Sequence, residues 1–344
     1  MKKIHKYLII TLVCLIANTG LKAGFIKDVS KVGTTGAPFL EIEAGARSIG
    51  MGGAFVALAD DATSTYWNPA GMVKINGNEA IFNHVQWLAD INYDYVSFIS
   101  NLDGNNAIGV SYTGLSMGDM EVRTVQEPEG TGEKFSAGSM ALGLSYSRRL
   151  TDRFTIGFTG KYISENIYHE SASAIAMDIG TQFRTPFKNM IIGMSISNFG
   201  NKMQMLGKDL LIKHDIDENI EGNNDRISGH LDTDKWSLPL LLRIGVAMNI
   251  LNTRYNRVTV STDAMHPNDN LESINVGGEY SYREFLFLRA GYTNLFLKDG
   301  EESLAAGAGI NYQIRNLATI KLDYAYSDFG ILNDVHRFSI SLKF

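Results

Sequence analysis

Short segments in which apolar and polar residues alternate recur from residue 78 to the end of the chain. In SMALGLSYS, residues 139–147, every second residue is large and apolar, and those between are small. This period of two is that of a β-strand whose two faces meet different surroundings. About fourteen such segments occur, most of them about as long as a tilted membrane strand of roughly 9 to 11 residues. They cover residues 78–87, 91–101, 106–116, 136–149, 152–165, 174–185, 190–199, 236–250, 257–265, 271–282, 285–295, 303–313, 317–327 and 334–344.

The gaps between these segments differ in length according to their parity. The even-numbered gaps are tight turns, such as RLTD near residue 150, SYRE near 283 and QIRN near 315. The odd-numbered gaps are mostly longer, above all residues 117–135 and 200–235. Bacterial outer-membrane barrels have short periplasmic turns, long external loops and an even number of strands. The pattern therefore predicts a barrel of fourteen strands with both of its ends on the periplasmic side.

One long apolar run occurs, at the start of the chain. Residues 1–23 have the basic start, apolar middle and short polar end of a secretion signal, so we expect the mature protein to begin near Gly24. The single cysteine, Cys14, lies within that run, and the mature chain is expected to form no disulfide. A mean hydropathy of −0.07 is too low for a bundle of membrane helices, each of about 20 apolar residues. The net charge of −6 argues against a nucleic-acid partner.

A secreted β-sandwich is the alternative fold, because its strands also alternate. The polar face of the segments is mostly Gly, Ser and Thr with isolated charges, which suits a wet lumen better than an exposed sheet. Aromatic residues lie on the apolar face near the strand ends, as at a membrane interface. They are Tyr162, Phe183, Phe187, Tyr280, Tyr292 and Tyr312. The sequence therefore predicts an all-β, transmembrane antiparallel β-barrel that contacts lipid and crosses the outer membrane of a Gram-negative bacterium many times.

The block before the first strand, APFLEIEAGARSIGMGGAFVALADDATSTYWNPAGM, is different in kind and covers residues 37–72. In the pairing of GARSIGMGGAFVALADDA with YWNPAGM it resembles the N-terminal signature of the FadL-like superfamily of outer-membrane proteins, most closely the PorV/PorQ family. The resemblance implies a fourteen-stranded barrel whose N-terminal segment folds into the lumen as a hatch, or plug. We accordingly expect a signal peptide at 1–23, an N-terminal segment with the hatch at 24–77, and the barrel at 78–344.

The chemistry of this block agrees with a hatch. Its glycines permit close backbone approach and positive φ angles, and an Asn before a Pro favours a tight turn in which the Asn side chain accepts a backbone N–H. Because charges inside a barrel need partners, internal ion pairs of Arg47, Asp60 and Asp61 with lumen charges are favoured over a ligand role. The expected hatch residues, structural first and possible contacts of a lumen ligand second, are Arg47, Gly50, Gly52, Gly53, Phe55, Asp60, Asp61, Trp67, Asn68 and Pro69.

Three patterns resemble parts of known functional sites. GMGGAF lacks the glycine spacing and the βαβ unit of a nucleotide loop. The GxSxG at residues 114–118 is followed by a loop, whereas a nucleophile elbow needs a helix there. Acidic residues alternate from Asp215 to Asp225, but an EF-hand loop counted from Asp215 would need Gly at Ile220 and Glu at Arg226, so a solvated loop is favoured over weak calcium binding. We expect no enzyme activity, no cofactor and no metal site.

The last segment ends the chain on an aromatic residue. Phe338, Ile340, Leu342 and Phe344 share one face. An alternating strand with an aromatic C-terminal residue resembles the signal by which the barrel-assembly machinery recognises its clients. The alternative is an ordinary closing strand, and both interpretations can hold together.

The resemblance implies two functions. PorV-like members are associated with type IX secretion, which would have the barrel bind partner or cargo proteins through its long loops. FadL-like members pass hydrophobic small molecules inward, which would require an apolar pocket beneath the hatch, near Phe55, Trp67 and Met72. A third possibility, an open diffusion pore, is disfavoured because residues 24–77 need a place and the lumen is the economical one.

Overall fold

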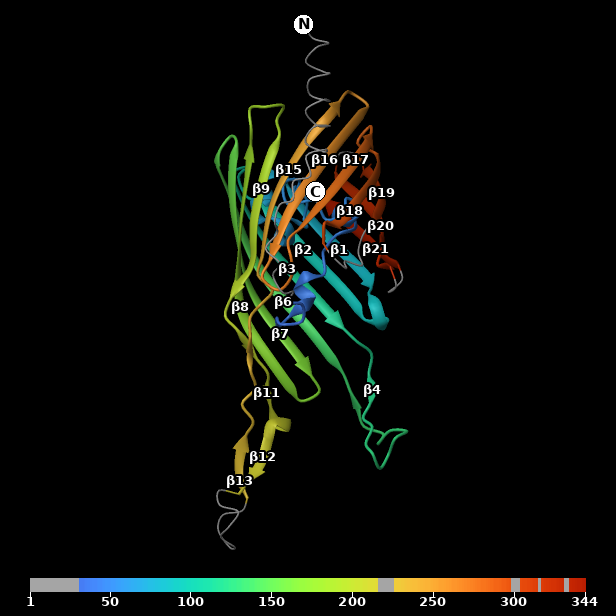
Figure 1. Ribbon diagram of the computed structural model, residues 1–344. Helices are drawn as coiled ribbons and strands as arrows, with labels where there is room; N and C mark the ends of the chain where they lie inside the picture. Colours follow the sequence, from blue (N-terminus) through green and yellow to red (C-terminus); the bar gives the residue numbers. More distant parts are fainter. Residues whose placement is uncertain (1–30, 216–225, 298–303, 315–316, 331–333) are drawn as a thin grey trace. The chain divides into compact units, whose positions relative to one another are not determined.

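Strands wind around a single closed barrel in the computed structural model of the protein (Figure 1). The structure describes residues 31–215, 226–297, 304–314, 317–330 and 334–344. Within these residues fourteen antiparallel strands form the wall. They are β1 (Asn78–Gln86), β2 (Asn92–Asn101), β3 (Asn106–Ser116), β6 (Ala137–Thr151), β7 (Phe154–Ile167), β8 (Glu170–Arg184), β9 (Ile191–Gly200), β15 (Leu241–Asn252), β16 (Asn256–Pro267), β17 (Ser273–Tyr282), β18 (Leu286–Leu295), β19 (Leu304–Ile314), β20 (Ala318–Asp328) and β21 (Asp334–Lys343).

Pairing of the first strand with the last closes the wall. Strand β1 pairs with β2 on one side and with β21 on the other, and β9 joins β8 to β15. Beyond the last residue of β21, Asn78 N donates to Phe344 O at 2.7 Å and Phe344 N donates to Asn78 O at 2.9 Å. A closed barrel leaves no wall strand with an unpaired edge, which is required where no water can satisfy backbone groups. The predicted fold class is confirmed.

The two faces of each strand separate as the alternation predicts. Leu144 on β6 is 69% exposed on the outside, whereas the next residue, Ser145, is 2% exposed and faces inward. Five of the six aromatic residues expected at the membrane interfaces lie on the outer face of wall strands, with Tyr162 and Tyr312 among the exposed ones; Phe187 lies in the turn between β8 and β9. An apolar outer face and a polar inner face are the surfaces that a membrane barrel needs.

Two strands begin four or five residues from the predicted start, whereas the other wall strands begin within two residues of it. Strand β15 begins at Leu241, not at residue 236, because Trp236 belongs to the short strand β14 (Lys235–Trp236), which pairs with β10 (Met203–Gln204) outside the wall. Strand β8 begins at Glu170, four residues before the predicted 174, and stays paired with β7 to its first residue. Both errors lie at strand ends, where neighbouring residues alternate weakly in size.

The connections at one end of the barrel are short, and the longest connections are at the other end (Figure 1). The C-terminus and the start of β1 lie at the short-turn end. At the opposite end, hairpins extend beyond the wall. Their elements are β4 (Met120–Glu121), β5 (Lys134–Phe135), β10, β11 (Leu206–Gly207), η4 (Lys208–Leu210), β12 (Leu211–His214), β13 (Ile227–His230) and β14; η3 (Leu88–Asp90) is a short turn between β1 and β2.

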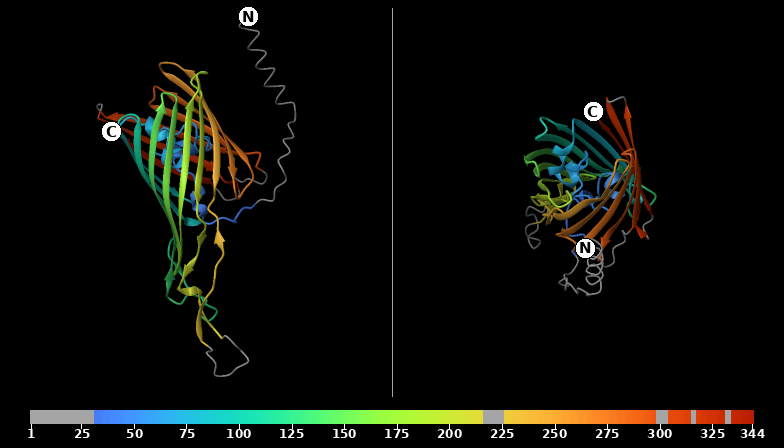
Figure 2. Two further views of the ribbon diagram at one scale, coloured as in Figure 1. Left: turned by 90° about the vertical axis from the view of Figure 1, so that its left-hand side faces the viewer. Right: turned by 90° about the horizontal axis from the view of Figure 1, so that it is seen from above.

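The segment before β1, residues 32–77, packs against the inward faces of the strands (Figure 2). It forms four short helical turns: η1 (Pro38–Glu41), α2 (Ala46–Ile49), α3 (Ser64–Trp67) and η2 (Pro69–Lys74). We call it the N-terminal segment. Most of its side chains are buried, and they make up much of the hydrophobic core. In the described part of the chain, no helix has the length and apolar character needed to cross a membrane.

Candidate functional site

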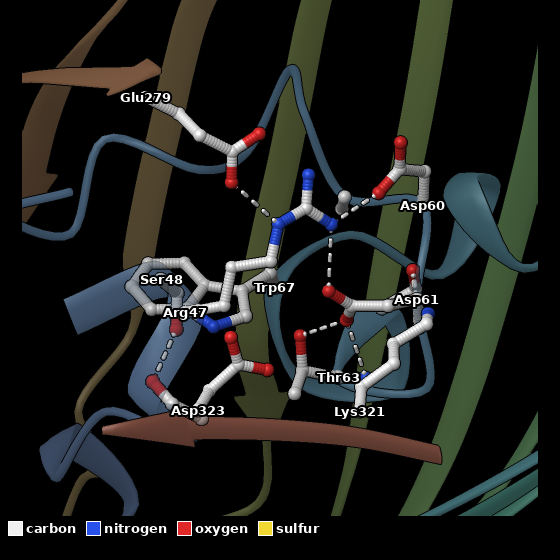
Figure 3. Close-up of polar contacts among 12 residues, drawn as sticks. Arg47, Ser48, Asp60, Asp61, Thr63, Trp67, Glu279, Lys321 and Asp323 are labelled. Carbon is white, nitrogen blue, oxygen red and sulfur yellow. Dashed lines mark hydrogen bonds and ion pairs between the residues drawn. The ribbon is translucent and has the colours of Figure 1, made fainter. Parts of the chain in front are cut away.

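Arg47 occupies the centre of a buried cluster of charges (Figure 3). It lies on α2 and its Nη1 contacts Asp60 Oδ1 at 2.6 Å and Asp61 Oδ2 at 2.9 Å. Its Nε lies 3.3 Å from Glu279 Oε2, which comes from β17. Burial opposes the charge of Arg47, but Asp60, Glu279 and Asp61 together raise its pKa well above the usual value. One side chain therefore connects the N-terminal segment to the barrel wall.

Glu279 extends this cluster to the strands around it. Arg289 Nε contacts Glu279 Oε2 at 2.8 Å, and Arg257 Nη2 contacts Glu279 Oε1 at 3.2 Å. Arg289 also reaches Asp323 Oδ1 on β20 at 2.6 Å. A buried carboxylate is tolerated when its oxygens are paired in this way. The charges inward of the wall therefore form a connected network.

Asp61 also shapes the chain next to it. Its Oδ1 accepts hydrogen bonds from Thr63 N at 3.0 Å and from Thr63 Oγ1 at 2.5 Å, so it closes the turn that leads into α3. The same carboxylate pairs with Arg47 through its other oxygen. Asp61 is buried, whereas Asp60 is partly exposed to the space beside Arg47. The two adjacent acids thus differ: Asp61 also closes a turn, whereas Asp60 is the more exposed of the two.

Glycines let the backbone of the N-terminal segment touch the wall directly. A Cβ at Gly277 on β17 would lie 2.1 Å from Met51 O, and a Cβ at Gly52, whose φ is +62°, would lie 2.6 Å from Tyr292 N. Gly50 faces Gly307 in the same way, and Gly53 also has a positive φ of +69°. Side chains at these positions would force the two backbones apart. The glycines of the sequence motif are therefore at points of closest approach.

Backbone groups of the segment form hydrogen bonds with side chains of the wall and of the segment itself. Asp263 on β16 accepts from Phe55 N at 2.7 Å and from Val56 N at 2.8 Å. Asn68 Oδ1 accepts from Ala70 N at 3.2 Å, as expected for an Asn before Pro69, and its Nδ2 donates to Val56 O and to Thr181 O. Buried backbone groups must find such partners. The irregular segment is therefore held by polar contacts of defined geometry.

The aromatic residues of the motif are in the packed core. Phe55 and Trp67 are fully buried and meet edge to face with ring centroids 5.9 Å apart. Trp67 Nε1 donates to Ala44 O at 2.8 Å. Neither these two residues nor Met72 lines one of the two large cavities described below. Phe55, Trp67 and Met72 therefore belong to the packed core, where these side chains pack against one another and against the wall.

One large cavity, of about 510 Å³, lies on the long-loop side of the segment. We call it the apolar cavity, since most of its lining is hydrophobic. Side chains from the segment and from strand ends far apart in the sequence form it. They include Phe39, Ile42, Ile49, Trp87, Ile91, Leu115, Leu241, Met265, Leu271, Leu297, Leu304 and Phe329, with Glu41, Glu43, Arg243 and Arg337 as its charged members.

A second cavity, of about 500 Å³, lies at the short-turn end. We call it the charged cavity. Its lining includes the cluster around Arg47 and the ends of several strands. The charged residues are Arg47, Asp60, Asp61, Lys74, Arg149, Arg184, Arg257, Glu284, Arg289, Lys321, Asp323 and Lys343. The N-terminal segment contributes to the lining of both cavities.

Sequence reasoning missed the residues that define these cavities. Arg243, Arg149 and Arg184 are visible in the sequence only as isolated charges in or beside strands. Their inward orientation follows from the alternation, but the alternation does not say which strands they face across the lumen. The signal that could have found them is the presence of Arg on a strand face otherwise made of small residues.

The two other sequence patterns are the GxSxG, whose Leu115 lines the apolar cavity, and the acidic alternation. The GxSxG falls at the end of β3 and leads into the loop before β4, without a helix. Residues 216–225, which carry most of the acidic alternation, lie outside the described residues, as do the expected signal peptide and Gly24. Among the residues that are described, no group of three or more His, Cys, Asp or Glu is placed to hold a metal. Phe338, Ile340, Leu342 and Phe344 all point outward.

A closed antiparallel barrel with an apolar outer face and a polar interior defines a bacterial outer-membrane protein. The family model for the type IX secretion system protein PorV matches residues 26–266, and the chain belongs to this family. The resemblance seen in the sequence is thereby confirmed. A comparison with curated proteins gives no match.

Solved structures with the same fold are distant in sequence. The CymD monoaromatic hydrocarbon channel has 13% identity and a TM-score of 0.56, covering 88% of this chain and 96% of that one. The toluene transporter TbuX of Ralstonia pickettii has 12% identity and a TM-score of 0.52, covering 87% and 97%. The toluene transporter TodX of Pseudomonas putida has 15% identity and a TM-score of 0.51, covering 87% and 96%. At these identities the similarity is one of fold.

Proposed function

We propose that this outer-membrane barrel binds partner or cargo proteins of type IX secretion through the hairpins at its long-loop end. The observation that carries the proposal is the match to the PorV family over most of the barrel. The hairpins support it, because they extend beyond the wall and are longer than barrel closure requires. Under this proposal the long-loop end faces outward from the cell and both chain ends face the periplasm.

The hairpins carry exposed apolar side chains outside the wall. Val125 is 95% exposed, and Leu211, Leu231 and Trp236 are each exposed by about half or more of their surface. Apolar side chains on a wall strand have lipid to cover them, whereas those on a loop beyond the wall do not. Exposed apolar groups of this kind are typical of protein interaction sites.

A variant of the β12–β13 hairpin tests this proposal. Leu211→Asp with Leu231→Asp places charges on the apolar surface, and we expect loss of copurifying partners and of secreted type IX cargo. Ser228→Asp, on the paired strand β13, is the matched control and should leave both unchanged. Barrel folding is checked by the mobility of heated and unheated samples in gels. Normal secretion and partner recovery with the double variant would contradict the proposal.

We also propose that the N-terminal segment acts as a hatch that closes the lumen. Its backbone contacts with inward glycines and its ion pairs with wall residues support this role. A closed lumen predicts no conductance of porin size in planar bilayers. Large, steady single-channel steps from the purified protein would rule out the hatch.

The second candidate function is a channel for hydrophobic small molecules. The apolar cavity favours it, as does the fold shared with channels described as hydrocarbon channels and toluene transporters. Burial, together with Asp269, raises the pKa of Glu41 in this cavity to about 7, with Arg243 opposing. Below that pH Glu41 is neutral, which makes the cavity less polar.

Filling the cavity tests this second function. Ala305 lines the cavity, whereas its neighbour Ala306 faces outward. Ala305→Phe should abolish toluene binding measured by calorimetry in detergent, and Ala306→Phe should leave it unchanged. If the wild-type protein binds no toluene while the hairpin variant impairs secretion, the channel function is excluded and the secretion function stands.

A further inference from the structure

Four cationic side chains of the charged cavity make no ion pair within the described part of the chain: Lys343, and the set of three formed by Lys74, Arg149 and Arg184. Lys74 comes from η2, Arg149 from the end of β6 and Arg184 from the end of β8. Arg149 Nη2 donates to Val73 O at 3.3 Å, so it is held beside Lys74 by the backbone. The carboxylates of the cavity pair elsewhere: Asp60 and Asp61 with Arg47, Glu284 with Arg257, and Asp323 with Arg289.

The cavity as a whole has an excess of positive charge. Eight cationic side chains and four carboxylates line it. Two further carboxylates, Glu79 and Glu279, are buried next to it and pair with lining residues. Even with these two included, the cations outnumber the anions. The excess includes Lys74, Arg149 and Arg184, with which these carboxylates make no ion pair.

This arrangement is unfavourable for Lys74. Burial lowers the pKa of Lys74 to about 8, and repulsion from Arg184 and Arg149 adds to the effect, while Asp60 offsets it only in part. Like charges held together away from bulk water repel more strongly than at a surface. An anion bound among the three side chains would relieve this repulsion.

We propose that the charged cavity binds a small molecule with a phosphate or carboxylate group between Lys74, Arg149 and Arg184. The guanidinium groups of Arg149 and Arg184 can each donate two parallel hydrogen bonds to an oxyanion, and the ammonium group of Lys74 can donate one more. A volume of about 500 Å³ is in the range of small-molecule sites. The cavity is at the short-turn end, which places the site on the periplasmic side in the orientation proposed above.

The test is a calorimetric titration of the full mature protein, in detergent at low ionic strength, with inorganic phosphate. We expect saturable binding, weakened roughly tenfold by Arg149→Gln or Arg184→Gln. Arg149→Lys keeps the charge and should retain most of the affinity. The matched control is Arg148→Gln, since Arg148 is the neighbouring residue on β6 and faces outward. Folding of each variant is checked by its gel mobility before and after heating.

A second arm distinguishes a soluble anion from a lipid headgroup. In nanodiscs, phosphatidylglycerol would compete with phosphate if the site takes a membrane phosphate, and phosphate affinity would then be lower than in phosphatidylcholine nanodiscs. Equal affinities would identify a soluble ligand. The proposal fails if the wild-type protein shows no saturable phosphate binding, or if Arg148→Gln weakens binding as much as Arg149→Gln does.

Discussion

Arg47 Nε lies 3.3 Å from Glu279 Oε2, although 232 residues separate the two in the chain. Arg47 forms ion pairs with two carboxylates of the N-terminal segment, Asp60 and Asp61, and with the buried carboxylate of Glu279 on β17. Because the side chain of Glu279 is only 1% exposed, its charge depends on the guanidinium groups around it. The segment and the wall therefore share one electrostatic network.

Loss of the Arg47 charge should weaken this connection. Arg47→Gln leaves Asp60 and Asp61 without their cation, and we expect the free energy of unfolding to fall by about 3 kcal/mol, as for other broken buried pairs. Urea unfolding in detergent, followed by tryptophan fluorescence, measures it. Lys188→Gln, an exposed position in a short turn, is the control. Equal midpoints for Arg47→Gln and wild type would show that the cluster does not hold the segment.

Close backbone packing predicts that alanine substitution at two adjacent glycines affects stability very differently. In Gly277→Ala the new Cβ would meet Met51 O at 2.1 Å, so the segment must move, at a cost of roughly 1–3 kcal/mol. In Gly278→Ala the nearest atom is 3.8 Å away, which is an ordinary contact. Unfolding midpoints and the rate of proteolysis of residues 32–77 should change in the first variant only. Similar behaviour of both variants would contradict the contact.

Lys74 should make stability depend on pH. Burial lowers its pKa in the folded protein to about 8, below the ordinary lysine value of 10.5. Between these two values the unfolded chain keeps the proton and the folded protein does not, so stability rises with pH. At pH 7 Lys74 is charged in both states, and its charge destabilises the folded protein. Lys74→Met should therefore raise the free energy of unfolding by roughly 2–3 kcal/mol. We expect the difference to shrink from pH 7 to pH 10; a constant difference would exclude this origin.

The aromatic end of the chain should act on assembly more than on stability. Phe344 is half exposed on the outer face, and only its backbone bonds to Asn78. Phe344→Ala keeps those hydrogen bonds, so we expect the folded barrel to unfold at nearly the same urea concentration. Its amount in the outer membrane should fall severalfold if the barrel-assembly machinery reads the aromatic residue. Leu322→Ala, an exposed residue of β20, is the control for loss of an outward side chain.

The wall could be predicted closely because strand alternation is a local property. Strands β3 and β21 begin at the predicted residues 106 and 334, and the inward or outward side of Ser145 and Leu144 follows from parity. The predicted strand starts were wrong where the local pattern and the tertiary pairing disagree. Trp236 continues the apolar pattern of β15 but pairs with β10. Pairing outside the wall depends on a partner 33 residues away, which periodicity does not report.

The glycine-rich motif and Arg47 were recognisable as an inner segment, but their partners were not. Arg47 forms an ion pair with Glu279, and the backbone of Met51 packs against Gly277. Both partners lie on β17, and the position of this strand relative to the N-terminal segment is set only when the fourteen strands close into a barrel. The two cavities have the same origin, since each is lined by strand ends distant in sequence. The sequence alone determined the class of fold, the facing of each strand residue and the family. The tertiary structure decided where the apolar cavity lies and where the unpaired cations of the charged cavity gather. Both depend on distances between residues far apart in the chain, which no local pattern contains.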